Sequence, residues 1–356
     1  MVDRDGEDGD ERERSFTVGE AAAELGVTPG TLRNWDRAGK LKPFRHPING
    51  YRLYRETDLR SLRHPNDTQR NEVLGRGVVF NDDGVQVYTA DARQKLTEFA
   101  DGTFQCCVTS PPYWGLRDYD HPNQIGAEPL LDDYIRDLVA VFREVRRTLR
   151  DDGVFWLNLG DAYTSGGRTW RAPDKKNKGR AMSYRPDTPQ GLKPKDLIGL
   201  PWRVAFALQA DGWYLRSDVV WNKPNCQPES VKDRLTRSHE YVFMFTKSER
   251  YYFDQEPIRE PAGNGATKNR RTIWNINTEG FRGAHFAVFP SRLVELCILS
   301  ATRSGDLVLD PFLGSGTVAA VSKKRGRACV GIEMNPDYAQ LAVERIEAET
   351  FQASLL

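Results

Sequence analysis

The chain has 356 residues, 39% of them hydrophobic and 28% charged, with a formal net charge of +1. This length allows one catalytic domain of ordinary size and one small domain. No secretion signal and no run of about 18 apolar residues is evident, which disfavours export and membrane insertion and predicts a cytoplasmic protein. The 5 cysteines include no CxxC pair, so we expect neither a disulfide framework nor a metal site.

The amino-terminal region begins with a charged leader, residues 1–14, which is too polar to bury a core and is predicted to be disordered. Residues 16–27 then predict a capped helix and a turn, and Thr28-Pro29 opens a second helix. Residues 39–55 predict a β wing, and a further helix begins at Glu56. A short helix, a glycine turn and a basic aromatic helix are the parts of a helix-turn-helix.

These elements resemble the winged helix-turn-helix of the MerR family, a small α+β domain, over residues 15–63, followed by a linker at 64–77. The resemblance implies DNA contacts by cationic and aromatic side chains of the second helix and the wing: Arg33, Trp35, Arg45, Tyr51, Arg52 and Arg55. The alternative is a module that docks on the catalytic domain or binds protein. MerR proteins usually dimerise through a long carboxy-terminal helix, and none is evident after Leu62, so the oligomeric state stays open.

The next informative segment is a predicted buried strand, residues 103–108, that runs into Thr109-Ser110-Pro111-Pro112-Tyr113. Consecutive prolines fix φ and end the strand abruptly, which makes a stiff corner. An exocyclic base amine is a poor nucleophile because its lone pair is delocalised into the ring. Ser110 Oγ and the Ser110 and Pro111 carbonyls could accept both of its N–H bonds and favour a pyramidal nitrogen, while the Tyr113 ring stacks on the base. The other interpretation is a surface turn, which the preceding strand disfavours.

A second motif follows about 200 residues later, where residues 307–321 predict a strand, a tight turn and a helix. Gly314 and Gly316 permit positive φ, so a ligand can lie against the main chain at the start of the helix. The next predicted strand ends at Glu333, whose carboxylate could accept both hydroxyls of a ribose. The spacing lacks GxGxxG, and no GxxxxGK[ST] occurs, so NAD and ATP are disfavoured and an adenosyl ligand without a phosphate remains.

Together the two motifs resemble those of the amino-group DNA methyltransferases that use S-adenosylmethionine, over roughly residues 78 to 345. The Thr-Ser-Pro-Pro-Tyr form is similar to the cytosine-N4 branch, whereas adenine-N6 members usually carry an acidic residue where Ser110 stands. Because the catalytic motif precedes the cofactor motif, the order resembles the permuted beta arrangement. The resemblance implies a three-layer, Rossmann-like α/β fold and methyl transfer from S-adenosylmethionine to the N4 amine of a flipped cytosine in double-stranded DNA.

The resemblance also implies roles for single residues. The base would be held and activated by the corner that follows the first motif strand: Ser110, Pro111, Pro112 and Tyr113. The cofactor would be held by residues after three predicted strands: Asp91, Asp310, Phe312, Gly314, Ser315, Gly316, Thr317 and Glu333. Asp91 is expected at the cofactor adenine amine, although the family usually has Gly-Asp where this chain has Ala90-Asp91. His239 is equally well interpreted as a loop residue or a substrate contact, and Cys106 and Cys107 are predicted to be packing residues.

Two basic stretches within the catalytic domain, placed at residues 78–350, are candidates for DNA contact. Residues 166–195 mix Arg and Lys with Gly and Pro, which predicts a mobile insertion that closes over the DNA backbone or is inert. Residues 251–283 mix cationic and aromatic groups and are the other candidate for target recognition. The acidic leader offsets these stretches, so the near-zero net charge does not exclude DNA binding, and a nucleoid-associated protein is expected.

Three alternatives stay open from the sequence. The first is adenine-N6 methylation by the same fold, because one residue at position 110 is an imperfect guide to the base. The second is a DNA-binding regulator whose methyltransferase-like half senses the cofactor without catalysis, and the third, weaker one is an RNA substrate. No nuclease motif is apparent, so DNA cleavage would need a separate restriction endonuclease.

Overall fold

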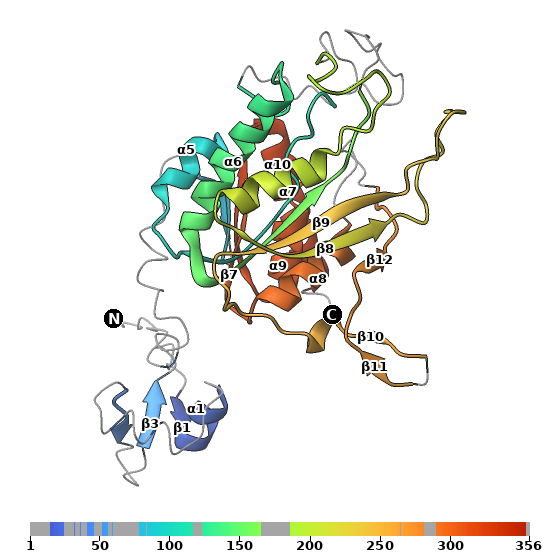
Figure 1. Ribbon diagram of the computed structural model, residues 1–356. Helices are drawn as coiled ribbons and strands as arrows, with labels where there is room; N and C mark the ends of the chain where they lie inside the picture. The colour runs from blue at the N-terminus through green and yellow to red at the C-terminus, as the bar shows by residue number, and fades with distance from the viewer. Residues whose placement is uncertain are drawn as a thin grey trace, which may run out of the picture. The chain divides into compact units, whose positions relative to one another are not determined.

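The chain divides into two compact units, residues 1–74 and 75–356, each described here by itself. The computed structural model (Figure 1) describes residues 15–24, 32, 36, 41–45, 52–55, 59, 78–82, 84–116, 123–164, 186–263, 265–280 and 290–353. The predicted leader and linker, the second helix with Arg33 and Trp35, and Tyr51 lie outside these residues. Within the described part of the chain, no helix is long and apolar enough to cross a membrane.

The first unit contains a small antiparallel sheet and a short helix: β1 (Ser15–Thr17), α1 (Val18–Glu24), β2 (Phe44–Arg45) and β3 (Arg52–Arg55), in strand order β1-β3-β2. The predicted wing is confirmed in its described part, where β2 and β3 pair antiparallel. The predicted helix starts too early at Phe16, because Phe16 pairs with Tyr54 in the sheet. The capping box that starts α1 instead joins Thr17 and Glu20, with the Glu20 amide donating to Thr17 Oγ1 at 3.4 Å and the Thr17 amide to Glu20 Oε2 at 2.8 Å.

A nine-stranded sheet forms the centre of the second unit, in the order β12-β8-β9-β7-β6-β13-β14-β5-β4. Neighbouring strands from β7 to β5 run parallel, whereas β9 is antiparallel to both of its neighbours and β4 is antiparallel to β5. The strands are β4 (Val78–Asp82), β5 (Val85–Thr89), β6 (Phe104–Thr109), β7 (Leu149–Leu159), β8 (Tyr214–Asn222), β9 (His239–Thr246), β12 (Ile273–Asn275), β13 (Leu307–Asp310) and β14 (Ala328–Glu333). The predicted strands at both motifs are thus confirmed.

Helices cover both faces of this sheet (Figure 1). One layer holds α5 (Ala92–Lys95), the 3-10 turn η1 (Leu96–Glu98), α6 (Leu131–Thr148) and α7 (Leu200–Ala210), and the other holds α8 (Ser291–Ala301), α9 (Thr317–Lys324) and α10 (Pro336–Ala353). Alternate strand residues face the two layers: Cys106 belongs to the same buried cluster as residues of α8 to α10, whereas Phe155 packs against Phe142 of α6, with 4.8 Å between the centroids of the tilted rings. The predicted three-layer α/β fold is confirmed.

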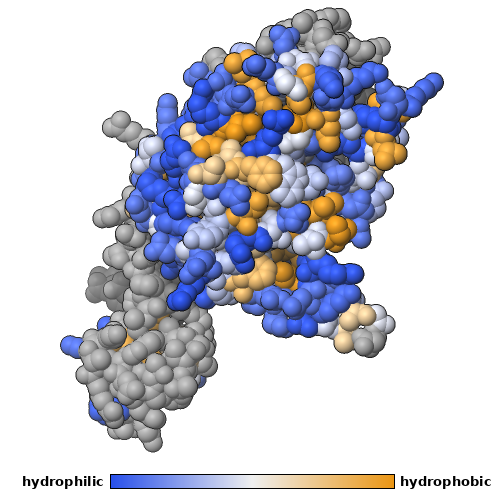
Figure 2. All heavy atoms as spheres, viewed as in Figure 1, coloured by the Kyte–Doolittle hydropathy of each residue, from blue (hydrophilic) through white to orange (hydrophobic). Residues whose placement is uncertain are grey.

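The surface shown in Figure 2 is largely hydrophilic, with apolar side chains in separate patches. The segment predicted for target recognition contains η3 (Glu256–Ile258), β10 (Glu260–Pro261) and β11 (Thr267–Lys268), and then β12 at the edge of the sheet. β10 and β11 form a small hairpin that stands away from the sheet (Figure 1). Of the predicted basic insertion, only residues 186–195 are described.

The two motif strands are direct neighbours, because β6 pairs parallel with β13 through Cys106 with Val308 and Cys107 with Leu309. The segments that follow β6 and β13 therefore leave the sheet at the same carboxyl edge, which is where open α/β sheets bind their ligands. Cys106 and Cys107 are fully buried in this strand, as their predicted packing role requires. Burial raises the pKa of both thiols well above the ordinary cysteine range.

Candidate active site

The corner after β6 is held in place by one phenol and one indole group. Tyr134 of α6 is fully buried and donates its hydroxyl to the Pro112 carbonyl at 2.8 Å. Trp114 donates its indole N–H to the Glu128 carbonyl at 2.8 Å. The stiffness predicted from two prolines is thus reinforced by tertiary hydrogen bonds, and the Pro112 carbonyl is engaged in the scaffold.

The side chains of this corner belong to a polar group that we call the Ser110 cluster: Ser110, Tyr113, Asn158, Lys223 and Glu240. Ser110 Oγ lies 3.3 Å from the Tyr113 hydroxyl and 3.4 Å from Asn158 Oδ1. The Tyr113 hydroxyl donates to Glu240 Oε2 at 2.9 Å, and Glu240 Oε1 is paired with the Lys223 ammonium. Burial, and then the Glu240 carboxylate, raise the pKa of Tyr113 well above its ordinary value, so the phenol keeps its proton.

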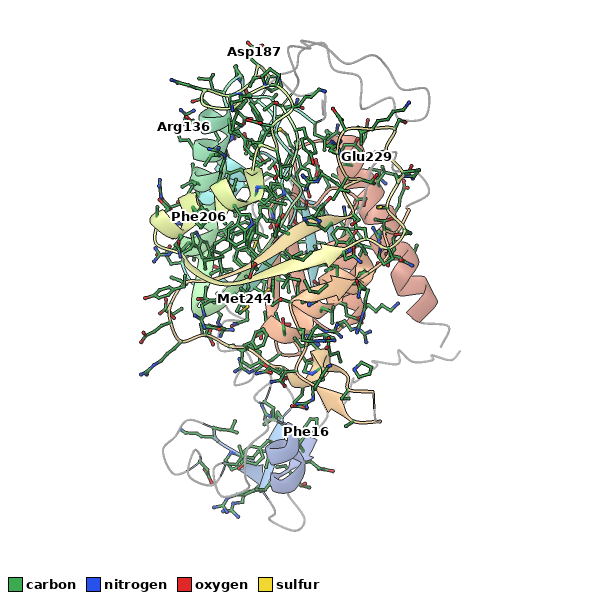
Figure 3. The ribbon with its side chains drawn as sticks, turned by 45° about the vertical axis from the view of Figure 1, so that its right-hand side comes forward. Phe16, Arg136, Asp187, Phe206, Glu229 and Met244 are labelled. Atoms are coloured by element: carbon green, nitrogen blue, oxygen red, sulfur yellow. The ribbon has the colours of Figure 1, made fainter. Side chains whose placement is uncertain are left out.

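Four strand ends supply the cluster. Ser110 and Tyr113 follow β6, Asn158 lies in β7, Lys223 follows β8, and Glu240 lies in β9. In Figure 3, Glu229 marks the loop beyond β8, and Met244 lies within β9, toward the other end of that strand from Glu240. Sequence reasoning assigned no role to Asn158, Lys223 or Glu240, although each is a polar residue at the end of an apolar strand.

Gly160 makes room for the Tyr113 ring. A Cβ atom at this position would lie 2.8 Å from Tyr113 Cε2 and 3.2 Å from the Glu240 carboxylate. Any larger residue would push the ring out of the Ser110 cluster, which accounts for a glycine directly after the apolar run of β7.

His239, at the start of β9, lies beside the Tyr241 ring with 5.5 Å between ring centroids.

A hydrogen bond joins the end of β6, just before the Ser110 corner, to the turn after β13 that is predicted to bind the cofactor. Thr109 Oγ1 donates to Asp310 Oδ1 at 2.6 Å, and the Phe312 amide donates to the same oxygen at 3.1 Å. The Thr109 and Asp310 side chains are both buried between neighbouring strands. Burial raises the pKa of Asp310 to about 7, because the hydrogen bonds only partly offset the cost of removing the carboxylate from water.

This raised pKa predicts an unusual effect of Asp310→Asn on stability. Below pH 3.8 the carboxyl is protonated in both states, and between pH 3.8 and about 7 the folded protein binds the proton more tightly than the unfolded chain. The wild type therefore loses stability as pH rises through this window, whereas the asparagine variant keeps a neutral Oδ1 acceptor. We expect the variant to gain up to about 4 kcal/mol relative to wild type between pH 4 and 8 in urea unfolding. A difference independent of pH would contradict this.

Glu333, at the end of β14, closes the turn that follows β13. Its Oε2 accepts the Gly314 amide at 2.8 Å and its Oε1 accepts the Asn335 amide at 2.9 Å. Burial raises the pKa of Glu333, and these backbone donors oppose the shift. Each oxygen has a second lone pair, so the carboxylate can also accept the two hydroxyls of a ribose. The site therefore fits an adenosyl group.

The two glycines of the turn have different roles. Gly314 has φ +52°, and a Cβ added there would meet no atom within 4 Å, so its backbone is open to a ligand. Gly316 has φ +79°, but its Cβ would lie 2.8 Å from the Cβ of Ala342 in α10. A side chain at position 316 would therefore disturb the packing of α10 on the start of α9, whereas the predicted contact of the Gly316 backbone with a ligand stays a prediction.

Other predicted cofactor residues already have partners within the protein. Thr317 Oγ1 accepts a hydrogen bond from Arg345 at 2.7 Å, and the same guanidinium lies 3.4 Å from Ser315 Oγ. Phe312 packs edge-on against Phe142, with 6.3 Å between ring centroids. Sequence reasoning missed Arg345, which lies 28 residues after Thr317.

Asp91 caps the first turn of α5. Its Oδ1 accepts the Arg93 amide at 2.9 Å, and the Arg93 guanidinium grips both carboxylate oxygens at 2.6 to 3.1 Å. Arg93 also donates to the Asn123 carbonyl at 2.7 Å. The Asp91 side chain therefore stands at the carboxyl end of β5 in a fixed orientation, one strand away from Glu333.

Three of the predicted DNA-contact residues of the first unit are described: Arg45, Arg52 and Arg55. They lie on paired strands, with Arg45 opposite Arg52. Arg52 Nε lies 3.1 Å from the Asp36 carboxylate, and the Arg55 guanidinium lies 5.6 Å from the Phe44 ring centroid. Arg45 and Arg55 are exposed, so this hairpin presents cations to solvent.

The fold and this site define a class, the S-adenosylmethionine-dependent methyltransferases. Residues 104–344 match the family model described as DNA methylase, and residues 17–54 match that of the MerR family regulatory proteins. The chain therefore belongs to the amino-methylating DNA methylase family and carries a MerR-like helix-turn-helix domain. S-adenosylmethionine is the cofactor of this family, as predicted, and double-stranded DNA is its substrate.

Curated relatives agree with this assignment. The type II methyltransferase M.SmaI from Serratia marcescens is 63% identical over 263 residues, which are 73% of this chain and 90% of the relative. M.Cfr9I from Citrobacter freundii is 58% identical over 278 residues, which are 78% of this chain and 93% of the relative.

Solved structures share the fold. PvuII DNA methyltransferase (cytosine-N4-specific) is 21% identical, with a TM-score of 0.59 over 78% of this chain and 94% of its own. A Thermus thermophilus protein, named as a putative DNA modification methylase and complexed with S-adenosyl-L-methionine, is 26% identical, with a TM-score of 0.52 over 74% of this chain and 93% of its own.

Proposed function

We propose that this protein methylates the N4 amine of a cytosine flipped out of double-stranded DNA. The observation that carries the proposal is the Ser110-Pro111-Pro112-Tyr113 corner, joined by the Thr109–Asp310 hydrogen bond to the turn closed by Glu333. The polar corner follows β6 and the turn follows β13, and these two strands are neighbours in the sheet, which supports a base and a cofactor that lie close together. Ser110 stands where adenine-N6 enzymes usually have an acidic residue, which favours cytosine.

The residues of the Ser110 cluster suit an amine that must become a nucleophile. Ser110 Oγ and the Ser110 and Pro111 carbonyls accept the two amine N–H bonds, which localises the nitrogen lone pair. Tyr113 contributes an aromatic ring at the same corner, where the base can stack on it. S-adenosylmethionine, when bound, supplies an electrophilic methyl group. Its ribose is assigned to Glu333 and its adenine to Asp91, with the Gly314 backbone alongside.

The proposal extends to the organisation of the chain. The catalytic strand precedes the cofactor strand, which corresponds to the permuted beta arrangement. We assign residues 15–63 to the winged helix-turn-helix, 64–77 to a linker and 78–350 to the methyltransferase domain. Residues 166–195 and 251–283 are the segments that contact DNA around the flipped base, and the exposed hairpin of the first unit adds a second DNA contact.

The type II relatives suggest the biological setting. Methyltransferases of restriction-modification systems protect DNA from a nuclease, so we propose a separate restriction endonuclease as the functional partner. The enzyme would then act at the nucleoid, in the cytoplasm.

Product analysis tests this function. Purified protein is incubated with unmethylated DNA and S-adenosylmethionine, the DNA is digested to nucleosides, and the modified base is identified by mass spectrometry. N4-methylcytosine is the expected product. N6-methyladenine would show that residues outside the corner set the base, and no modified base on several unrelated DNAs, despite cofactor binding, would overturn the proposal in favour of a regulator or an RNA methyltransferase.

A further inference from the structure

The Ser110 cluster contains two hydroxyl protons and a fixed set of acceptors. Asn158 Nδ2 donates to the Tyr241 carbonyl at 3.1 Å, which turns Asn158 Oδ1 toward Ser110 and Tyr113. The protonated phenol of Tyr113 donates to Glu240 Oε2 at 2.9 Å, the shortest contact of either hydroxyl. The Ser110 proton then has two acceptors within the cluster, Asn158 Oδ1 and the Tyr113 oxygen.

This direction of hydrogen bonding matters for the base. A hydroxyl that donates inside the protein keeps its lone pairs for an incoming N–H donor, whereas a hydroxyl that accepts from a neighbour turns its own proton outward. A base amine needs acceptors on both N–H bonds. Ser110 is therefore useful only while its proton is directed into the cluster.

Glu240 supplies one oxygen for each of two donors. Oε2 faces Tyr113, and Oε1 is paired with the Lys223 ammonium. Lys223 is itself fixed, with its Nζ 4.2 Å from the centroid of the Trp221 ring. Both side chains of the ion pair are more than four-fifths buried, so the pair is shielded from competing water.

We propose that Glu240, oriented by Lys223, is a positioning residue that holds Tyr113 as a donor and thereby keeps Ser110 Oγ an acceptor for the base amine. This inference rests on the proposed function, and it applies to a cytosine or an adenine amine. Glu240 acts through Tyr113 and Ser110 and is not placed in contact with the base.

Glutamine at position 240 is the informative change, because it has one oxygen for two donors. The Lys223 ammonium cannot accept a hydrogen bond, so it takes the oxygen and turns the NH₂ group toward Tyr113. Tyr113 must then donate to Asn158 Oδ1 or to Ser110 Oγ, each at 3.3 Å. If Tyr113 donates to Asn158 Oδ1, it competes with the Ser110 proton for that acceptor. If it donates to Ser110 Oγ, it occupies a Ser110 lone pair that the base amine needs.

Removing the second donor should reverse this effect. Lys223→Met keeps an unbranched chain against Trp221 but donates no hydrogen bond. In the double variant the side-chain oxygen at position 240 is free to turn to Tyr113, so Tyr113 again donates to residue 240. Adding Lys223→Met should therefore raise the activity of Glu240→Gln.

The experiment compares wild type, Glu240→Gln, Lys223→Met and the double variant as full-length chains. Transfer of labelled methyl to unmethylated plasmid DNA is followed with enzyme in excess, together with the KM for DNA and the affinity for S-adenosylmethionine. We expect Glu240→Gln to lower the transfer rate about tenfold to a hundredfold with KM and cofactor affinity nearly unchanged. The double variant should recover at least about fivefold over Glu240→Gln, a coupling that only interacting residues show.

Lys247→Met is the matched control, since Lys247 pairs with Asp151 at 3.1 Å at the other end of β9. Lys247→Met should not change the methyl-transfer rate of wild type, and it should not raise the rate of Glu240→Gln. Equal rates for Glu240→Gln and wild type, or a double variant no faster than Glu240→Gln, would overturn the positioning role while leaving methyl transfer intact. A wild type that transfers no methyl group to DNA would overturn the proposed function itself.

Discussion

Ser110→Ala is expected to lower the rate of methyl transfer at least about a hundredfold while leaving the fold and cofactor binding intact. In the proposed function the Ser110 hydroxyl is the side-chain acceptor for the base amine, and its loss leaves the Ser110 and Pro111 carbonyls for that role. Its hydrogen bonds, at 3.3 Å to Tyr113 and 3.4 Å to Asn158, are long and contribute little to stability. Single-turnover transfer, calorimetric cofactor binding and thermal unfolding, measured together, check the three parts of this expectation.

Ser304→Ala provides the matched control for this prediction. Ser304 is exposed, and it precedes β13 at the opposite edge of the sheet from Asp310. Removing its hydroxyl deletes the same chemical group far from the corner, so the transfer rate should stay at the wild-type value. If Ser110→Ala kept more than about a tenth of the wild-type rate, the side chain would not be an essential acceptor, and the carbonyls would have to activate the amine alone.

The parts of the fold that the sequence predicts are those with local causes. The apolar run before Thr109-Ser110-Pro111-Pro112 favours a strand followed by a stiff corner, and Gly314 with φ +52° fits a tight turn after β13. Glu333 was identifiable because it directly ends a buried run. The direct parallel pairing of β6 with β13 is a finding of the structure, and it brings the two motifs to the same carboxyl edge of the sheet.

The remaining parts of the site depend on tertiary pairing that no local pattern encodes. Tyr113 and Glu240 are 127 residues apart, and they meet because β9 enters the sheet antiparallel, between β8 and β7. The reason for glycine at position 316 lies in α10, where Ala342 leaves no room for a side chain. The sequence neighbours of Phe16 favour a helix, whereas its pairing with Tyr54 is a long-range contact that no local pattern predicts.

Glu333→Gln is expected to weaken S-adenosylmethionine binding at least about a hundredfold, because in the proposed site the carboxylate accepts hydrogen bonds from the turn and from the ribose at the same time. Its oxygens hold the Gly314 and Asn335 amides at 2.8 and 2.9 Å, and the assigned ribose hydroxyls need the remaining lone pairs. Glutamine has one oxygen for these donors, so its NH₂ group must face a backbone N–H and the turn after β13 opens. Calorimetric titration with the cofactor measures this effect directly.

The loss of turn structure and the loss of ribose contacts can be separated in the same variant. Urea unfolding without cofactor reports only the two backbone hydrogen bonds, and we expect a loss of about 2 to 3 kcal/mol there. Glu347→Gln, an exposed carboxylate on α10, should change neither stability nor affinity by a comparable amount. If Glu333→Gln lost stability but bound the cofactor as tightly as wild type, Glu333 would serve the turn alone, and the ribose would have to be assigned to another acceptor at the same sheet edge.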